Sequence, residues 1–321
     1  MTNLLIASIA FLLIVAVVQV VRVGELLSKV NKEDVNEITE KDNKTQGILM
    51  LVVGSLFLLS VVWQIIYWGP LALPAASSEH GLLIDGLMSF TMWLIIIVFF
   101  ILHPILFWYT YKYSGKDKGV AFFYPHNNKL ELIWTIAPTI VLTAVILYGL
   151  STWDKITNDI PQESQIVEVY SEQFAWTARL SGEDNVLGNS DFRLVTAENH
   201  LGINMEDELS QDDIIVGEVH IVVNKPVLLK FRSRDVIHSA FLPHFRVQMN
   251  CVPGMVTQFG FTPTQTTAEM KVQEENEDFE FVLLCNKICG SGHYSMQMNF
   301  VVETQEEYDA WVSGQKTLGA Q

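Results

Sequence analysis

The sequence predicts an α+β membrane protein, in which about four N-terminal transmembrane helices precede an extramembrane β-domain. Half of the 321 residues are hydrophobic and the mean hydropathy is +0.27, which is too apolar for an ordinary soluble protein. Long apolar runs occupy the first 150 residues, whereas short alternating runs follow them. The charge is also uneven, because residues 1–151 carry ten acidic and nine basic side chains and residues 152–321 carry 26 and 11.

Four apolar stretches are long enough to cross about 30 Å of hydrocarbon. They cover residues 4–21, 48–67, 87–107 and 132–150, and the first is at the short end of the range. The loops between the first and second stretches and between the third and fourth are basic, with Arg22, Lys29, Lys32, Lys41 and Lys44 in one and Lys112, Lys116, Lys118 and Lys129 in the other. The loop between the second and third stretches has no lysine or arginine. The positive-inside rule therefore places the N-terminus and the C-terminal domain outside the cytoplasm.

A cleaved signal peptide is the alternative interpretation of the first stretch. It has no basic region ahead of its apolar core. Cleavage would also leave three spans and bring the C-terminal domain into the cytoplasm, which conflicts with the loop charges. We therefore expect an uncleaved first span.

Residues 156–304 are predicted to form a β-sandwich or barrel, because short alternating runs are broken by Gly, Pro, Asn and Asp. A polar stretch at about 181–213 interrupts the pattern and is predicted to be a long surface loop. Residues 305–318 are expected to form a short amphipathic helix. The predicted divisions are two membrane hairpins, a β-domain and a C-terminal helix or tail, at 1–78, 79–155, 156–305 and 306–321.

The acidic second part of the chain bears on its partners. Such a surface repels nucleic acid and anionic lipid headgroups and attracts basic proteins, although it could serve solubility alone. The three cysteines, Cys251, Cys285 and Cys289, do not make a disulfide framework. No C-x-x-C-H occurs, so no covalently attached c-type haem is expected in this chain.

The segment CNKICGSGHYSM supplies Cys285, Cys289, His293 and Met296 in one loop between two predicted strands, and His238 lies upstream at the end of another β run. Thiolate, imidazole and thioether ligands together favour copper over Mg²⁺, Ca²⁺ or Mn²⁺, and zinc rarely uses methionine. Two cysteines and two histidines exceed the needs of a mononuclear blue-copper site. Two thiolates can bridge two copper ions. A disulfide or a structural zinc site is the alternative, but a disulfide leaves both histidines and the methionine unexplained.

These residues resemble the copper-A signature of subunit 2 of the haem-copper cytochrome c oxidases, through DVIHS, VPGM and C-x-x-x-C-G-x-x-H-x-x-M. The run LELIWTIAPTIVL, residues 130–142, resembles that family's second membrane helix, and the resemblance covers about residues 80–305. It implies that residues 156–305 form a cupredoxin-like Greek-key β-barrel and that residues 79–155 form the family's usual membrane hairpin. The hairpin at 1–78 is extra.

The resemblance also implies two copper ions and their ligands. The ligands would be the bridging thiolates of Cys285 and Cys289, one imidazole each from His238 and His293, and weak ligands from Met296 and the backbone carbonyl of Lys287. The family usually has glutamate at the last position, where its side chain helps to hold Mg²⁺. A lysine ammonium is a donor-only cation and cannot do this.

Three further positions take a role from the resemblance. Glu131 matches a glutamate at the mouth of a proton path into subunit 1, although an ordinary acidic residue at a helix N-terminus is an equal alternative. The run EQFAW resembles the family's Gln-Trp-x-Trp, in which the first tryptophan receives electrons from cytochrome c. Phe174 replaces that tryptophan and Trp176 matches the second. Phe174 is therefore the expected electron-entry position.

Two other residues have plainer interpretations. His103 lies deep in the third apolar stretch, where an ionisable residue is a functional candidate. A neutral histidine packed against a neighbouring helix is the interpretation that we favour. Cys251 has no partner in the sequence pattern and is expected to be a small core residue.

The resemblance implies the electron-entry subunit of an aa3-type-like cytochrome c oxidase, which passes electrons from a c-type cytochrome to the haem of subunit 1 for O₂ reduction. The apolar stretches contain too few histidines to hold haem, so haem is expected only in the partner subunit. The alternatives are a structural subunit with a non-functional copper site, as in quinol oxidases, and a nitrous oxide reductase. The intact ligand set argues against the first, and the chain has no room for the propeller of the second.

The expected partners are subunit 1, other oxidase subunits, membrane lipid and the donor cytochrome. Phe174 and the extra hairpin together suggest a donor held in a respiratory supercomplex rather than one that only diffuses freely. No transit peptide is evident, so we expect a bacterial cytoplasmic (inner) membrane with the copper domain on its periplasmic side. No nucleic-acid partner is expected.

Overall fold

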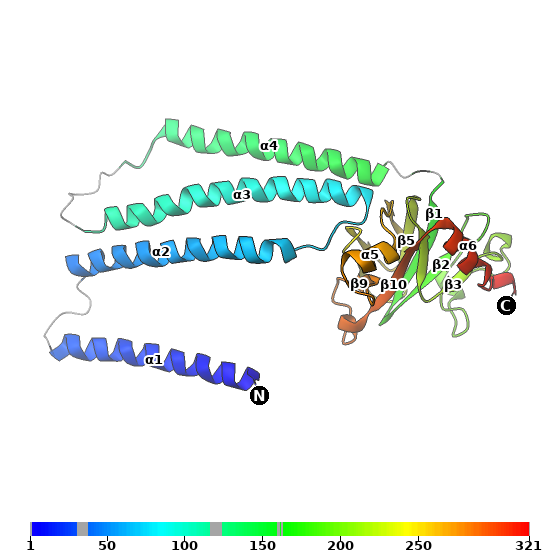
Figure 1. Ribbon diagram of the computed structural model, residues 1–321, viewed down its shortest axis with the longest axis horizontal. Helices are drawn as coiled ribbons and strands as arrows, with labels where there is room; N and C mark the ends of the chain where they lie inside the picture. Colours follow the sequence, from blue (N-terminus) through cyan, green and yellow to red (C-terminus); the bar gives the residue numbers. More distant parts are fainter. Residues whose placement is uncertain (1, 31–37, 116–123, 159–160, 162, 321) are drawn as a thin grey trace. The chain divides into compact units, whose positions relative to one another are not determined.

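The computed structural model describes residues 2–30, 38–115, 124–158, 161 and 163–320 (Figure 1). Lys32, Lys116 and Lys118, which contribute to the predicted cytoplasmic loops, lie outside the described residues. The chain divides into two compact units. One contains Met1–Pro70 and Ile95–Asn127, and the other contains Leu71–Leu94 and Asn128–Gln321.

The first half of the chain forms long apolar helices, as predicted. They are α1 (Thr2–Val30), α2 (Glu40–Trp68), α3 (Glu79–Lys112) and α4 (Asn128–Asn158). All four are long and apolar enough to cross a membrane. A capping box starts α2, because the Thr39 hydroxyl accepts the Asp42 N–H at 3.2 Å and the Asp42 carboxylate accepts the Thr39 N–H at 3.0 Å.

Within the first unit, two glycines allow α2 to approach the C-terminal half of α3. A methyl group on Gly54 would lie 2.5 Å from the Phe107 ring, and one on Gly47 would lie 2.3 Å from the Ser114 hydroxyl. Small residues are a common means of close helix packing in membranes. His103 lies in the same region, with its Nδ1 3.0 Å from the Phe99 carbonyl of its own helix and its ring 6.4 Å from the Phe57 ring of α2.

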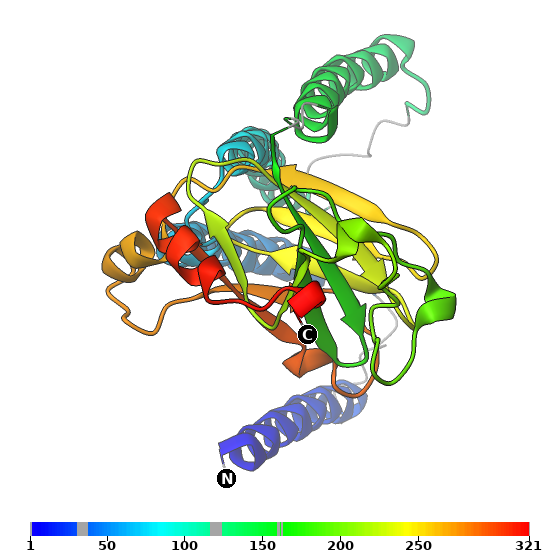
Figure 2. The same ribbon diagram turned by 90° about the vertical axis from the view of Figure 1, so that its right-hand side faces the viewer.

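The second half of the chain forms a β-domain of two five-stranded sheets within the described residues (Figure 2). The first sheet has the order β3-β2-β1-β5-β8, and the second has the order β4-β10-β9-β6-β7. The pairs β1–β5 and β4–β10 are parallel, and the other named pairs are antiparallel. The strands are β1 (Gln165–Glu172), β2 (Ala175–Leu180), β3 (Ile214–Val216), β4 (Val219–Val222), β5 (Val227–Ser233), β6 (His238–Leu242), β7 (Val247–Cys251), β8 (Thr257–Phe261), β9 (Phe281–Cys285) and β10 (Gln297–Glu303).

The core lies between the two sheets and follows the predicted alternation. On β5, Val227, Leu229 and Phe231 are fully buried, and they share one apolar cluster with Leu283 of β9 and Phe300 of β10. Burial of this continuous apolar surface is the main force that holds the sheets together. The predicted fold class, membrane helices followed by a β-sandwich or barrel, is confirmed.

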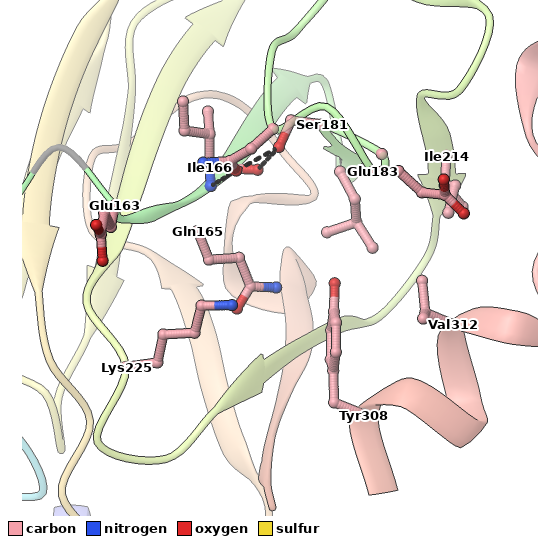
Figure 3. Close-up of a pocket in the computed structure, with 12 residues that line it drawn as sticks. Glu163, Gln165, Ile166, Ser181, Glu183, Ile214, Lys225, Tyr308 and Val312 are labelled. Carbon is pink, nitrogen blue, oxygen red and sulfur yellow. Dashed lines mark hydrogen bonds between the residues drawn. The ribbon is translucent and has the colours of Figure 1, made fainter. Parts of the chain in front are cut away.

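Two helices accompany the β-domain, α5 (Thr267–Gln273) and α6 (Gln305–Ser313). The predicted C-terminal helix therefore exists, but it ends at Ser313 rather than at 318, because Gly314 caps it. Tyr308 and Val312 of α6 face Gln165 across a cavity of about 420 Å³ (Figure 3). None of the site residues predicted from the sequence lines this cavity.

Candidate metal centre

The strand pairing of the second sheet assembles the predicted copper ligands. Cys285 ends β9 and is paired with Ala240, two residues beyond His238 at the start of β6. The loop that follows Cys285 returns at Met296, whose carbonyl accepts the Cys285 N–H at 3.2 Å. A pattern that is dispersed over 59 residues of sequence thus converges at one end of the sheet.

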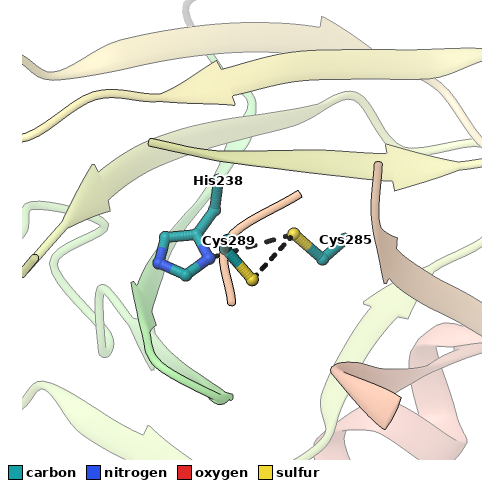
Figure 4. Close-up of side chains that lie close together, drawn as sticks. All are labelled: His238, Cys285 and Cys289. Carbon is teal, nitrogen blue, oxygen red and sulfur yellow. Dashed lines mark hydrogen bonds between the residues drawn. The ribbon is translucent and has the colours of Figure 1, made fainter. Parts of the chain in front are cut away.

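The ligand atoms lie close together in the core (Figure 4). The Sγ atoms of Cys285 and Cys289 are 3.9 Å apart, and the side chains of His238, Cys285 and Cys289 place one ligand atom each within 4.8 Å of one another. The remaining short distances are His238 Nδ1–Cys285 Sγ 3.8 Å, His293 Nδ1–Cys289 Sγ 3.7 Å, Met296 Sδ–Cys289 Sγ 3.9 Å and Lys287 O–Cys285 Sγ 3.2 Å. All six residues predicted as ligands are therefore brought together.

Burial and protonation show what this cluster can hold. His238, Cys285, Cys289 and Met296 are buried, and both cysteines are free thiols, so they do not form the alternative disulfide. Burial and, second, the neighbouring Cys285 raise the pKa of the Cys289 thiol to about 11. Two adjacent buried thiolates need a compensating cation. Soft sulfur donors with imidazole nitrogen fit copper.

Asp235 orients His238. The Nε2 of His238 is 2.9 Å from Asp235 Oδ1, and the carboxylate also accepts the Gln173 and Val236 N–H groups at 2.7 Å each. Burial acts to raise the pKa of Asp235, but these hydrogen bonds outweigh it and hold the pKa below its usual value. A carboxylate that accepts Nε2–H leaves Nδ1 unprotonated toward Cys285, as a metal-binding histidine requires.

The turn between β1 and β2 touches the ligand loop from a second side. Gln173 Nε2 donates to the Cys289 carbonyl. The Phe174 ring packs on Gly290 and Gly292, where an added methyl group would lie 2.7 Å and 2.6 Å from ring atoms. Gly290 also has φ +146°, which favours glycine. Phe174 is 36% exposed, so the predicted electron-entry residue links the ligand loop to the surface.

The other two predicted site residues have different settings. Trp176 is buried, and its ring lies 6.0 Å from the His238 ring. Glu131 is exposed in the first turn of α4. About 40 Å of helix separates it from the end of α4 that leads to the β-domain. Glu131 therefore does not belong to the cluster, and both interpretations of it stay open.

Asp235 and Gln173 were not predicted from the sequence as parts of this site. Asp235 was visible as the first residue of the quoted DVIHS, three residues before His238. Gln173 was visible in the run EQFAW. Neither position showed by itself that it would contact a ligand, because each contact depends on the packing of separate strands.

Comparisons with known proteins agree with this architecture. Residues 60–152 match the family model described as cytochrome c oxidase subunit II, transmembrane domain, and residues 166–304 match the model described as its periplasmic domain. The alternative cytochrome c oxidase subunit 2 of Bradyrhizobium diazoefficiens is 33% identical over 274 residues, which cover 84% of this chain and 91% of the relative. The cytochrome c oxidase subunit 2 of Cereibacter sphaeroides is 26% identical over 256 residues, covering 76% and 78%.

Among solved structures, the chain is similar to the periplasmic domain of subunit II of cytochrome oxidase from Bradyrhizobium japonicum. The identity is 21% and the TM-score is 0.33, with 48% of this chain and 94% of that chain covered. The family match to residues 166–304, together with the two-sheet domain, supports the cupredoxin-like assignment.

Proposed function

The chain belongs to the cytochrome c oxidase subunit II family, and we propose that its β-domain holds a dinuclear copper-A centre that carries electrons from a c-type cytochrome to the haem of oxidase subunit 1. As a member of this family the chain is a membrane-bound electron-entry subunit of an oxidoreductase complex, with its copper domain outside the membrane. The number of copper ions, the ligand roles and the identity of the haem partner are the proposed parts.

The observation that carries the proposal is the convergence of two free thiols, two imidazole Nδ1 atoms and a thioether in one cluster. The Sγ atoms of Cys285 and Cys289, 3.9 Å apart with one imidazole next to each, would hold a pair of copper ions. When bound, a pair of copper ions shares one electron, which spreads the change in charge and lowers the rearrangement that each transfer requires.

The chain's own residues make this site suitable for fast transfer. Burial of His238, Cys285, Cys289 and Met296 shields these four side chains from water, whereas His293 is half-buried. Asp235 holds the ring of His238 and accepts the Gln173 N–H from the turn between β1 and β2. The side chain of Gln173 donates to the Cys289 carbonyl, so this one turn contacts both parts of the cluster. Ligands that are held in this way reorganise little when the charge changes.

The decisive experiment measures copper per chain and the EPR and near-infrared spectra of the purified full-length chain. We expect two copper ions and a mixed-valence signal that disappears in both Cys285→Ser and Cys289→Ser. Cys251→Ala is the matched control, because it removes the third cysteine without removing a proposed ligand. A signal that persists in both serine variants, or a stoichiometric zinc content in place of copper, would contradict the proposal.

The position of Phe174 against the ligand loop supports electron entry at this residue. Phenylalanine is harder to oxidise than tryptophan and lacks the indole N–H, but an apolar ring still fills a docking patch. Phe174→Trp is expected to speed oxidation of a soluble cytochrome c more than turnover with the native donor. An equal effect on both donors, or a native rate that falls steeply on dilution, would contradict a donor held in a supercomplex.

The additional membrane segment and the acidic outer half support that donor arrangement. The acidic side chains steer a basic cytochrome, and tethering raises its effective concentration. Helices α1 and α2 supply apolar surface for assembly with a neighbouring complex in a bacterial inner membrane. Glu131 serves as the entrance of a proton path in the same proposal, and Glu131→Gln should then slow proton uptake without changing the copper spectrum.

A further inference from the structure

The turn between β6 and β7 is enclosed by the segment that leads into α3. The Ser77 N–H donates to the His244 carbonyl at 2.8 Å, and the Ser78 hydroxyl donates to the Phe245 carbonyl at 2.7 Å. Both serines are fully buried. Buried polar groups of this kind need their partners, so the membrane-proximal segment and the turn are matched to each other.

Arg246 extends this contact to α3 itself. Its Nε is 2.8 Å from Asp85 Oδ1, its Nη2 is 3.0 Å from Asp85 Oδ2, and Nη2 also donates to the Pro74 carbonyl at 2.7 Å. The side chain of Arg246 is 9% exposed and that of Asp85 is 32% exposed. A planar guanidinium that meets a carboxylate through two N–H groups fixes direction as well as distance.

The backbone conformation of Arg246 bears on why an arginine occupies this position. Its φ is +55°, in the left-handed region that glycine adopts most easily. A non-glycine residue at such a φ carries a conformational cost, which the contacts of its side chain offset. The turn alone would be served by glycine, so the contact with Asp85 and Pro74 is the feature that needs arginine.

The same hairpin carries a proposed copper ligand at its other end. His238 begins β6 and is paired with Cys251, the last residue of β7, whereas Arg246 lies in the turn at the opposite end. The hairpin is held in the second sheet, because its strands share five residue pairs and β6 also pairs with β9. The contact of the turn with the first part of α3, which lies in the same compact unit, therefore sets where His238 stands relative to that part of the helix.

We infer that Arg246 is a positioning residue for electron transfer. Its clamp on Asp85 and Pro74 fixes the copper-bearing hairpin relative to α3, and so sets the separation between the copper centre and the electron acceptor that the partner subunit holds in the membrane. The inference rests on the proposed function. It concerns the transfer out of the centre, not the binding of copper or the entry of electrons.

The test uses the assembled oxidase with Arg246→Gly and Asp85→Asn. Arg246→Gly suits the positive φ, so the turn is expected to fold without the clamp. An electron is injected at the copper centre with a photoactivated ruthenium complex, and its departure to the membrane acceptor is timed. We expect this rate to fall by roughly tenfold in both variants, within the range that a misplacement of about 1 Å costs in positioned reactions.

Two readouts separate positioning from a general structural effect. The copper EPR spectrum and the rate at which soluble cytochrome c reduces the centre should stay at their wild-type values. Arg193→Gln is the matched control, because Arg193 pairs with Asp191 on an exposed surface and should leave all three readouts unchanged. An unchanged departure rate in fully assembled Arg246→Gly and Asp85→Asn would overturn the clamp, as would a changed copper spectrum. A wild-type chain without the copper signal would overturn the proposed function and the clamp together.

Discussion

Two buried polar clusters of the β-domain differ in how their charges are balanced. In the first, which we call the charge cluster (Glu168, Arg179, Asp213 and Arg232), Arg179 is 1% exposed and lies 3.0 Å from Glu168 and 3.3 Å from Asp213. In the second, the ligand cluster described above, the two thiols face imidazole nitrogens and a thioether. No arginine or lysine side chain is paired with them in the described part of the chain. A buried cluster in which carboxylates and guanidinium groups offset one another stabilises the fold. A buried cluster of thiols without a basic partner instead points to a bound metal cation.

The contacts of the charge cluster show its architectural role. Arg232 binds Glu168 through two N–H groups at 2.6 and 3.1 Å, and it donates to the Leu201 carbonyl at 2.9 Å. The Gly188 N–H donates to Asp213 at 3.1 Å. Leu201 and Gly188 belong to the polar stretch 181–213, so the cluster fastens this stretch to the first sheet. The sequence predicted this stretch as a surface loop but did not predict that the charge cluster anchors part of it in the core.

The largest expected effect comes from Glu168→Gln. Glu168 is buried and contacts both Arg179 and Arg232, so the variant leaves two guanidinium groups short of charge. We expect a loss of about 3–5 kcal/mol in the free energy of unfolding, measured by urea unfolding of the detergent-solubilised chain.

The copper signal of the folded fraction should remain, because the charge cluster contributes no ligand. The exposed Glu206 on the polar stretch provides the control, and Glu206→Gln should change stability by less than about 0.5 kcal/mol. Loss of copper from folded Glu168→Gln would break the distinction between the two clusters.

The two clusters also differ in how far the sequence predicts them. Cys285, Cys289, His293 and Met296 fall within twelve residues, and their types identify a soft metal, so local spacing was sufficient. The charge cluster joins Glu168 to Arg232 across 64 residues. This contact depends on the parallel pairing of β1 with β5, in which Tyr170 is level with Arg232. No local sequence pattern predicts the register of these two strands.

The same reasoning applies to the membrane helices and to the two residues that contact the ligands, Asp235 and Gln173. Long apolar runs predicted α2, α3 and α4, because hydrocarbon thickness imposes a minimum length. The end of α6 was misplaced because the apolar anchor Leu318 continues the pattern beyond Gly314, after the helix has ended. Asp235 and Gln173 lie in the motifs DVIHS and EQFAW. Their hydrogen bonds form only because the turn between β1 and β2 of the first sheet packs against the ligand loop of the second sheet.

A second, smaller effect is expected on copper affinity from Asp235→Asn. The neutral amide is a weaker acceptor for the Nε2–H of His238, so Nδ1 is held less firmly toward Cys285. Replacing such a partner typically costs about 10–100-fold in metal affinity. Competition with a copper chelator would measure the loss.

Asp191→Asn is the matched control, because Asp191 also accepts a backbone N–H, from Arg193 at 2.9 Å, but lies away from the ligands. The unfolding free energy of the copper-free chain should change little in either variant. Equal copper affinity in Asp235→Asn and the wild type would show that the carboxylate does not tune the ligand cluster.

The smallest expected effect is a pH dependence within the charge cluster. Burial, opposed by the Arg179 guanidinium and the Gly188 N–H, raises the pKa of Asp213 to about 6 from its ordinary value of 3.8. The folded chain therefore binds more protons than the unfolded chain between about pH 4 and 6. Stability from this group is complete below about pH 4 and is lost as the pH rises through 6.

Asp213→Asn has no such proton to lose. We expect the free energy of unfolding of Asp213→Asn, relative to that of the wild type, to rise by on the order of 1 kcal/mol from pH 4 to pH 7. The difference between the two chains is the useful quantity, since carboxyl groups with lowered pKa values contribute the opposite slope to both. A flat difference over this range would mean that Arg179 fully offsets the effect of burial, so that the pKa of Asp213 in the folded chain lies near its ordinary value.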